Sequence, residues 1–224
     1  MAKSRLASFQ GSKDPAAIIG VSIDLSELEK LQNLFPAIRT AIAQAVKRSL
    51  SRTVNAGASQ AARMFVEAYT RLKLSDVKDA RFKASVKAPS DDVTTMAGLV
   101  SISGKGIVLD KLKPKKTKTG VMVPKRFGKP WVIEGAFYAK VFKTNKGPNW
   151  WKREGKSRFP LILLTAKSPA YVFREKEKPN EKLRTYLRER FMTEIGPNLG
   201  FYVDAAVFKA GLKSKALRDA IKNI

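Results

Sequence analysis

The sequence contains no cysteine and no histidine. Disulfides, thiolate chemistry and the common zinc sites are therefore excluded. Without imidazole, an acid–base enzyme would have to use carboxylates or a lysine with a shifted pKa. Asp91 lies beside Asp92, and Glu175 and Glu177 lie near Glu181, but nothing in the sequence places them in a dry cleft. We therefore expect no enzyme, no catalytic residue, no cofactor and no metal site.

Long apolar runs are also missing. The longest, FPLILL at residues 159–164, is far shorter than the roughly 20 residues that a membrane-spanning helix requires. The N-terminal stretch lacks the apolar centre of a secretory signal, and Ala2 stands where a myristoylation signal requires glycine. We expect a soluble intracellular or assembled protein without a membrane partner.

Acidic residues are scarce relative to basic ones. The chain has 44 Lys and Arg against 19 Asp and Glu, which gives a net charge of +25. This charge exceeds what solubility requires and indicates a polyanionic partner. It is densest in KLKPKKTKTGVMVPKRFGKP, residues 111–130, which holds eight cations and no acid. The candidate contacts to DNA in a lumen or to an acidic partner are Lys111, Lys113, Lys115, Lys116, Lys118, Lys125, Arg126 and Lys129.

Two interpretations of this basic stretch remain open. It could be a solvated, mobile hairpin loop, or it could neutralise phosphates without reading sequence. Aromatic residues occur only near its end, at Phe127 and Trp131, which disfavours base stacking on single strands. No helix-turn-helix or similar reader is visible. If DNA is contacted here, it is contacted for its charge.

Hydrophobic periodicity predicts helices at both ends of the chain. Over residues 37 to about 72 apolar residues fall at helical spacing, which predicts one long helix. Whether Gly57 interrupts this helix is left open. Helical spacing returns at Asn180, and Gly196 with Pro197 is expected to end or kink that helix before another continues. Between them, residues 81–175 alternate as strands do, with SGKG at 103–106 as a hairpin turn and not a phosphate loop.

This order predicts an α+β fold: a long N-terminal helix, a central and mostly antiparallel β-sheet with a basic hairpin loop, and C-terminal helices. We expect residues 1–22 to be a flexible N-terminal arm. Residues 23–224 are expected to form a single α+β domain that is helical over 23–80, β-rich over 81–175 and helical over 180–224. Trp150 and Trp151 point to opposite sides of an extended chain, so we expect at least one in the core, and the other could be an interface anchor.

Three segments in order carry a resemblance to a known family. They are the helix and basic strand AVKRSLSRTVNAGASQAARMF and LSDVKDARFKASVK, the strand IEGAFYAKVF, and KSRFPLILLTAKSPA. Together, over roughly residues 37–210, they resemble the minor tail protein Z family of tailed bacteriophages, the tail completion proteins. Lys167 stands where many relatives have glycine. The residues that carry the motif or an interface are Gly135, Ala136, Phe137, Trp150, Trp151, Arg158, Pro160, Ser168 and Pro169.

The resemblance implies a structural virion protein, assembled in the host cytoplasm, in the neck at the head-proximal end of the tail. It implies a ring of copies of this chain, by analogy a hexamer, that contacts the tail terminator or tail tube and the head–tail connector. It also implies that genomic DNA passes through the ring without specific contacts. The alternative from composition alone is a non-sequence-specific nucleic-acid-binding protein of the nucleoid or ribosome type.

Overall fold

The computed structural model describes residues 16–21, 25–67, 72–77, 81–124, 130–140, 148–175 and 177–209. The chain divides into two compact units, each assembled from separate stretches. We call residues 18–59, 83–101 and 180–224 the helical unit, and residues 1–17, 60–82 and 102–179 the strand-rich unit. Residues 23–224, which the sequence predicts to be one domain, thus contribute to two units. The predicted mixture of helices and antiparallel strands is confirmed.

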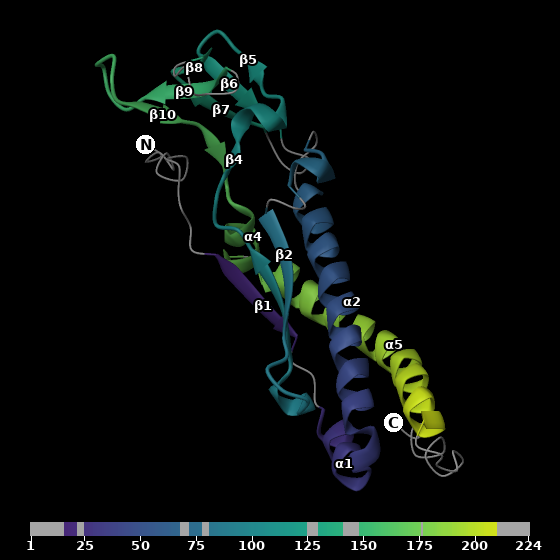
Figure 1. Cartoon of the computed structure of the whole chain (residues 1–224). Helices are drawn as coiled ribbons and strands as arrows, with labels where there is room; N and C mark the ends of the chain where they lie inside the picture. The colour runs from purple at the N-terminus through teal and green to yellow at the C-terminus, as the bar shows by residue number, and fades with distance from the viewer. Residues whose placement is uncertain are drawn as a thin grey trace. The chain divides into compact units, whose positions relative to one another are not determined.

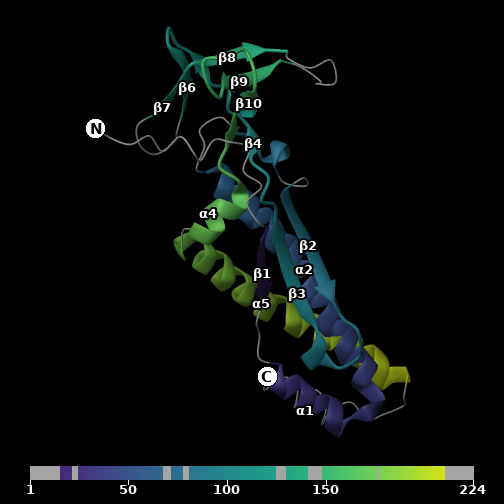
Figure 2. The same ribbon diagram turned by 90° about the vertical axis from the view of Figure 1, so that its left-hand side faces the viewer.

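Two long helices dominate the helical unit (Figure 1). Its elements are β1 (Ala17–Val21), α1 (Ser26–Leu34), α2 (Arg39–Val66, whose last residues belong to the strand-rich unit), β2 (Phe82–Lys87), β3 (Ala97–Ile102) and α5 (Glu177–Lys209). The three strands form one sheet in the order β1-β3-β2. Figure 2 shows this sheet beside α2.

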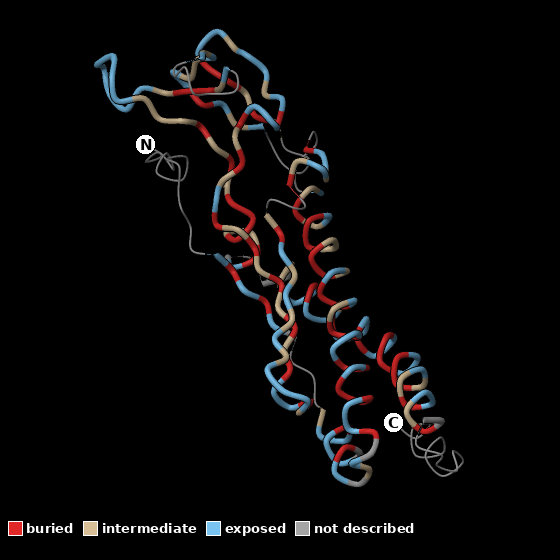
Figure 3. The backbone as a smooth tube through the Cα atoms, in the orientation of Figure 1, coloured by how far each residue is buried: buried red, intermediate tan, exposed pale blue. Residues whose placement is uncertain are grey.

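Apolar residues at helical spacing explain why α2 and α5 form and pair. On α2, Ile42, Val46 and Leu50 are fully buried, and Leu187 and Phe191 of α5 are equally buried. Buried and exposed positions alternate along α2 in Figure 3, as in an amphipathic helix. Burial of this face, more than helix propensity, stabilises such helices.

Each long helix continues through its candidate break: α2 through Gly57, where the sequence leaves an interruption open, and α5 through Pro197, where it predicts an end or a kink. Gly57 lies inside α2, where the absence of a side chain leaves room for Leu187 of α5 and Val100 of β3. Pro197 lies inside α5, which continues to Lys209, so the expectation that the helix ends there is wrong. Leu199 and Val203 beyond the proline are as buried as Phe191 before it. Packing of both halves on one core outweighs the roughly 3 kcal/mol that an internal proline costs.

The expectation of an arm over residues 1–22 also needs correction. Residues 17–21 form β1, at the edge of the three-stranded sheet. Ala17 and Ile19 are buried whereas Ile18 is exposed, which is the alternation of a half-buried strand. The rest of the proposed arm, apart from Ala16, lies outside the described residues.

Buried polar groups fix α2 against α5. The Asn198 side-chain amide donates to the Ser49 hydroxyl at 2.9 Å and to the Glu194 carbonyl at 2.8 Å. The Ser49 hydroxyl in turn donates to the Ala45 carbonyl at 2.8 Å. These bonds pair groups that would each cost about 1–3 kcal/mol if they were buried alone. They allow one register between the two helices.

The strand-rich unit consists of several small antiparallel sheets. Its elements are β4 (Ile107–Val108), β5 (Lys115–Lys116), β6 (Gly120–Val123), β7 (Trp131–Glu134), β8 (Ala136–Ala139), β9 (Asn149–Arg153), β10 (Leu161–Leu163), β11 (Thr165–Ala166) and α4 (Pro169–Glu175). The sheet orders are β5-β6-β7, β8-β9-β10 and β4-β11. Phe65, Phe82 and Phe173 are buried together, with ring centroids 6.2 Å apart in each successive pair.

The predicted hairpin turn at SGKG does not join two paired strands. β3 pairs with β1 and β2, whereas β4, which follows the turn, pairs with β11. A Cβ at Gly106 would lie 2.8 Å from the Ala166 carbonyl oxygen, so this glycine permits the close approach of β11. Pairing across a long sequence separation therefore replaces the local hairpin.

Candidate functional site

The basic stretch forms a small sheet in the strand-rich unit. β6 pairs antiparallel with β5 on one side and with β7 on the other. One sheet face is apolar and buried, because Val121, Val123 and Ile133 are each at most 3% exposed. The hydrophobic strand between the lysines thus attaches the charged segment to the unit's core. Part of the predicted loop is a strand.

The turn between β5 and β6 holds its lysines outward. Thr117 N–H donates to the Gly120 carbonyl at 2.9 Å, and Gly120 N–H donates to the Thr117 hydroxyl at 3.1 Å. A Cβ at Gly120 would lie 2.1 Å from the Ile133 carbonyl oxygen, so no other residue fits here without displacement of β7. Lys115, Lys116 and Lys118 around this turn are all exposed. We call these three residues the lysine hairpin.

Of the five other basic residues of the stretch, two lie in the described part of the chain and three do not. Lys111 is exposed but lies 3.5 Å from an Asp76 carboxylate oxygen, which partly neutralises it. Lys113 has a left-handed backbone conformation, φ 45°, at the end of the 3₁₀ helix Leu109–Leu112. Lys125, Arg126 and Lys129 lie outside the described residues.

Two large side chains of the strand-rich unit are half exposed, one in the sheet of the lysine hairpin and one in the β8-β9-β10 sheet. Val132 on β7, opposite Met122, is 49% exposed, and Tyr138 on β8 is 47% exposed. The Tyr138 ring lies 5.1 Å from that of Trp150. Desolvation and the nearby Asp110 carboxylate raise the pKa of the Tyr138 hydroxyl above its usual value.

The Gly-Ala-Phe segment forms a tight connection and then a paired strand. Gly135 has φ +71°, a conformation that favours glycine, and its N–H donates to the Thr119 carbonyl at 2.8 Å. Ala136 and Phe137 follow in β8, where Phe137 pairs with Trp151 of β9. Gly135 thus makes the connection between two strands, and Ala136 and Phe137 form part of a paired strand.

Both tryptophans are buried. Trp150 is 6% exposed and Trp151 is 5% exposed, and the Trp151 indole N–H donates to the Ala139 carbonyl at 3.0 Å. The core interpretation therefore holds for both side chains within this chain. Neither offers the exposed ring that an interface anchor requires.

The third motif segment contains a surface loop and a helix start. Arg158 and Pro160 are exposed, and the Arg158 guanidinium lies 5.9 Å from the centroid of the exposed Phe159 ring. Ser168 is buried, and its hydroxyl accepts from Tyr171 N–H at 3.1 Å, with Pro169 as the first residue of α4. Ser-Pro is thus a helix cap followed by a proline at the first helical position. Lys167 Nζ lies 3.9 Å from the centre of the Tyr171 ring.

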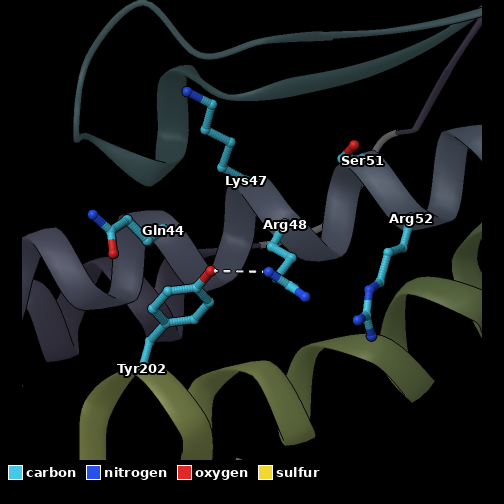
Figure 4. A pocket seen from close by; sticks show the side chains of 6 residues that line it. All are labelled: Gln44, Lys47, Arg48, Ser51, Arg52 and Tyr202. Carbon is cyan, nitrogen blue, oxygen red and sulfur yellow. Dashed lines mark hydrogen bonds between the residues drawn. The ribbon is translucent and has the colours of Figure 1, made fainter. Parts of the chain in front are cut away.

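A second basic surface lies in the helical unit. A hollow of about 400 Å³ is lined by Gln44, Lys47, Arg48, Ser51 and Arg52 of α2 and by Tyr202 of α5. We call it the arginine hollow. Figure 4 shows Arg48, Arg52 and Tyr202 facing the space between the helices, whereas the Lys47 side chain extends away from Tyr202. Arg48 Nη1 donates to the Tyr202 hydroxyl at 3.4 Å.

An ion-pair network orients one side of the arginine hollow. Arg52 Nη1 lies 3.1 Å from one Glu194 carboxylate oxygen, and Arg190 Nη2 lies 2.5 Å from the other. Glu194 is nearly buried, with a side chain 11% exposed, whereas the side chains of Arg52 and Arg190 are about half exposed. One carboxylate therefore balances only one of the two guanidinium charges.

The sequence alone did not single out this hollow. The sequence did contain an indication of a basic surface, because α2 carries five cations and no acid over Arg39–Val66. The positions 44, 48 and 52 repeat every four residues and so share one helix face. Tyr202, however, is 150 residues away from Arg52 in the sequence, and only the packing of α5 brings it to this face.

Over the part of the chain that the structure describes, no three or more acidic side chains gather as a metal site would require. In that same part, no helix has the length and apolar character needed to cross a membrane. Comparisons with protein-family models, curated proteins and solved structures found no match to this chain.

Proposed function

We propose that this chain is a structural virion protein of a tailed bacteriophage. In this proposal it is a tail completion component that forms a ring at the head-proximal end of the tail. The ring joins the tail to a filled head and lets DNA pass. The proposal rests first on the ordered resemblance of three sequence segments to the tail completion family.

The observation that carries the proposal is the lysine hairpin. Three lysines lie exposed around the turn between β5 and β6, which is fixed to a buried apolar sheet face. Lysine is a compact, hydrated charge on a flexible stem, and it attracts phosphates without reading bases. A channel through which a genome moves needs such contacts, because a tight sequence reader would stall the DNA.

Exposed large side chains in the same unit support the ring. Val132 and Tyr138 are about half exposed on β7 and β8, which are consecutive strands of the strand-rich unit in the sequence. In a head-to-tail ring each subunit offers such a surface to a different surface of the next copy. Burial of apolar area between copies would stabilise the ring by roughly 25 cal/mol per Å².

Location is the first test. Antibody-labelled electron microscopy would be applied to particles and free tails from cells that produce the protein. Label at the tail end next to the head supports the proposal. Unlabelled particles, with the protein recovered on cellular DNA, would overturn it in favour of a nucleoid-type nucleic-acid-binding protein.

The lysine hairpin is tested by replacing Lys115, Lys116 and Lys118 together with glutamine. We expect an unchanged fold, because all three side chains are exposed, and a loss of head–tail joining or DNA delivery. The matched control replaces Lys83, Lys87 and Arg188, which are also exposed and carry the same total charge. If joining and delivery survive the hairpin variant as well as the control, the hairpin is solvated surface only.

A further inference from the structure

We infer that the arginine hollow is a binding site for the phosphodiester backbone of a nucleic acid. This site is separate from the lysine hairpin, which belongs to the other unit of the chain. The inference does not depend on the phage-tail proposal. It rests on the shape, charge and hydrogen-bonding groups of the hollow itself.

The charge of the hollow favours an anion. None of the six lining residues is acidic, and three of them are cations. Within the described residues, Arg52 is the only one of these three with an ion-pair partner, and it shares Glu194 with Arg190. Lys47, Arg48, Arg52 and Arg190 together with Glu194 leave a net charge of about +3 around the hollow.

The Arg48 side chain is positioned to bind a ligand. Its guanidinium faces the space between α2 and α5, and its 3.4 Å bond to the Tyr202 hydroxyl is long and therefore weak. An arginine has five N–H donors in a planar fork that matches two oxygens of a phosphate. A phosphate in the hollow could engage this fork while Tyr202 supplies a further hydroxyl donor.

The mixture of donors favours a phosphodiester backbone over a protein carboxylate. Arginine and lysine are joined here by an amide, Gln44, and by two hydroxyls, Ser51 and Tyr202. This set of groups makes most protein contacts to nucleic-acid phosphates and sugars. Gln44, Arg48 and Arg52 follow one another every four residues, about 6 Å apart along α2. They can therefore contact successive groups of an extended chain.

The test measures binding of a short fluorescent DNA duplex by anisotropy as salt is raised from about 0.05 to 0.2 M. The full chain would carry glutamine at the lysine hairpin, so that the remaining affinity reports other sites. Arg48→Gln is compared with Arg188→Gln, which removes the same charge from an exposed position of α5. Arg188 is 14 residues before Tyr202, about 21 Å along the helix.

We expect Arg48→Gln to lower the salt slope of log K by about 0.9, as the loss of one phosphate contact does. At about 0.1 M salt this corresponds to a roughly eightfold weaker binding. Tyr202→Phe, which changes no charge, should weaken binding without changing the slope. Arg188→Gln should change the slope less than Arg48→Gln does.

Two results would overturn the inference. Equal effects of Arg48→Gln and Arg188→Gln would mean that only the diffuse charge of the chain attracts DNA. A poly-glutamate peptide that binds more tightly than the duplex, and loses its affinity in Arg48→Gln, would make the hollow a site for an acidic protein segment. Circular dichroism of each variant confirms that the helices remain folded.

Discussion

The contact between α2 and α5 at Gly57 gives a sharp prediction. In most helices Gly→Ala stabilises the protein by about 1 kcal/mol, because alanine has the higher helix propensity. At Gly57 an added Cβ would lie 2.3 Å from Leu187 Cδ2 and 3.4 Å from Val100 Cγ2. Leu187 is 1% exposed, so its side chain has no open space into which it can turn.

The size of the effect follows from two opposing contributions. Overpacking of a filled core costs about 1–3 kcal/mol, against the gain of about 1 kcal/mol in propensity. Gly57→Ala should therefore change the free energy of unfolding by between zero and about 2 kcal/mol, in the destabilising direction. Gly200→Ala is the matched control, because Gly200 lies inside α5 with no heavy atom within 4 Å of an added Cβ. That variant should gain about 1 kcal/mol.

The propensity gain is common to both variants, so their difference isolates the cost of the steric clash. We expect Gly57→Ala to be less stable than Gly200→Ala by about 1–3 kcal/mol in urea unfolding followed by helical circular dichroism. Hydrogen exchange of the α2 amides gives a local measure within the helical unit. Adding Leu187→Ala should relieve the clash, which a double-mutant cycle detects. Equal stabilisation by the two glycine replacements would refute the close packing of α2 against α5.

Two further predictions concern hydrogen bonds in the helical unit. The Thr53 hydroxyl is fully buried and has no hydrogen-bond partner among the described residues, so Thr53→Val should raise the free energy of unfolding by about 1 kcal/mol. The Ser49 hydroxyl, in contrast, accepts from Asn198, so Ser49→Ala should lower the free energy of unfolding by about 1–3 kcal/mol. A destabilised Thr53→Val variant in urea unfolding would mean that the hydroxyl is satisfied. The Thr94 hydroxyl and N–H hold the pKa of Asp92 below its usual value, so Thr94→Val should raise that pKa in an NMR titration. Because the pKa of Asp92 is depressed in the folded protein, the stability that ionised Asp92 contributes is present above the unfolded pKa of about 3.9 and is lost as pH falls through the folded pKa. An unchanged Asp92 pKa in Thr94→Val would contradict the assignment of the shift to Thr94.

Regular periodicity made the long helices predictable, and tertiary packing decided their ends. The apolar residues of α2 and α5 recur at helical spacing, so the helices themselves follow from the sequence. Local rules leave an interruption at Gly57 open and predict an end or a kink at Pro197, but α2 continues through Gly57 and α5 does not end at Pro197. Gly57 meets Leu187, and Pro197 is flanked by residues buried on one core, so packing outweighs a local preference that the sequence alone displays.

Strand pairing was less predictable than helix formation. The residues of β3 and β4 look like a hairpin because SGKG separates them, but β4 pairs with β11 about 60 residues later. Strand propensity reports a strand and says little about its partner, since the pairing depends on burial and neighbouring strands. For the same reason β1, a five-residue edge strand, was included in the expected arm.

The basic stretch was predictable from charge density, whereas the arginine hollow was not. Eight cations in one segment stand out in any sequence. The hollow needs residues of α2 and one tyrosine of α5, and their meeting depends on the register that Ser49 and Asn198 fix. A cationic helix face without acids was the available signal, but it does not reveal which hydroxyl completes the site.

The two basic surfaces differ in chemistry, and this difference suggests different roles. The lysine hairpin offers mobile point charges on exposed stems, which attract a polyanion without fixing its position. In the arginine hollow, Glu194 orients the guanidinium group of Arg52, so less side-chain entropy is lost when a phosphate binds. Under the two proposals, the lysine hairpin would let DNA move and the arginine hollow would hold it briefly. Loss of the hairpin should then impair attraction at low salt, whereas loss of Arg48 should shorten the time that the DNA stays bound.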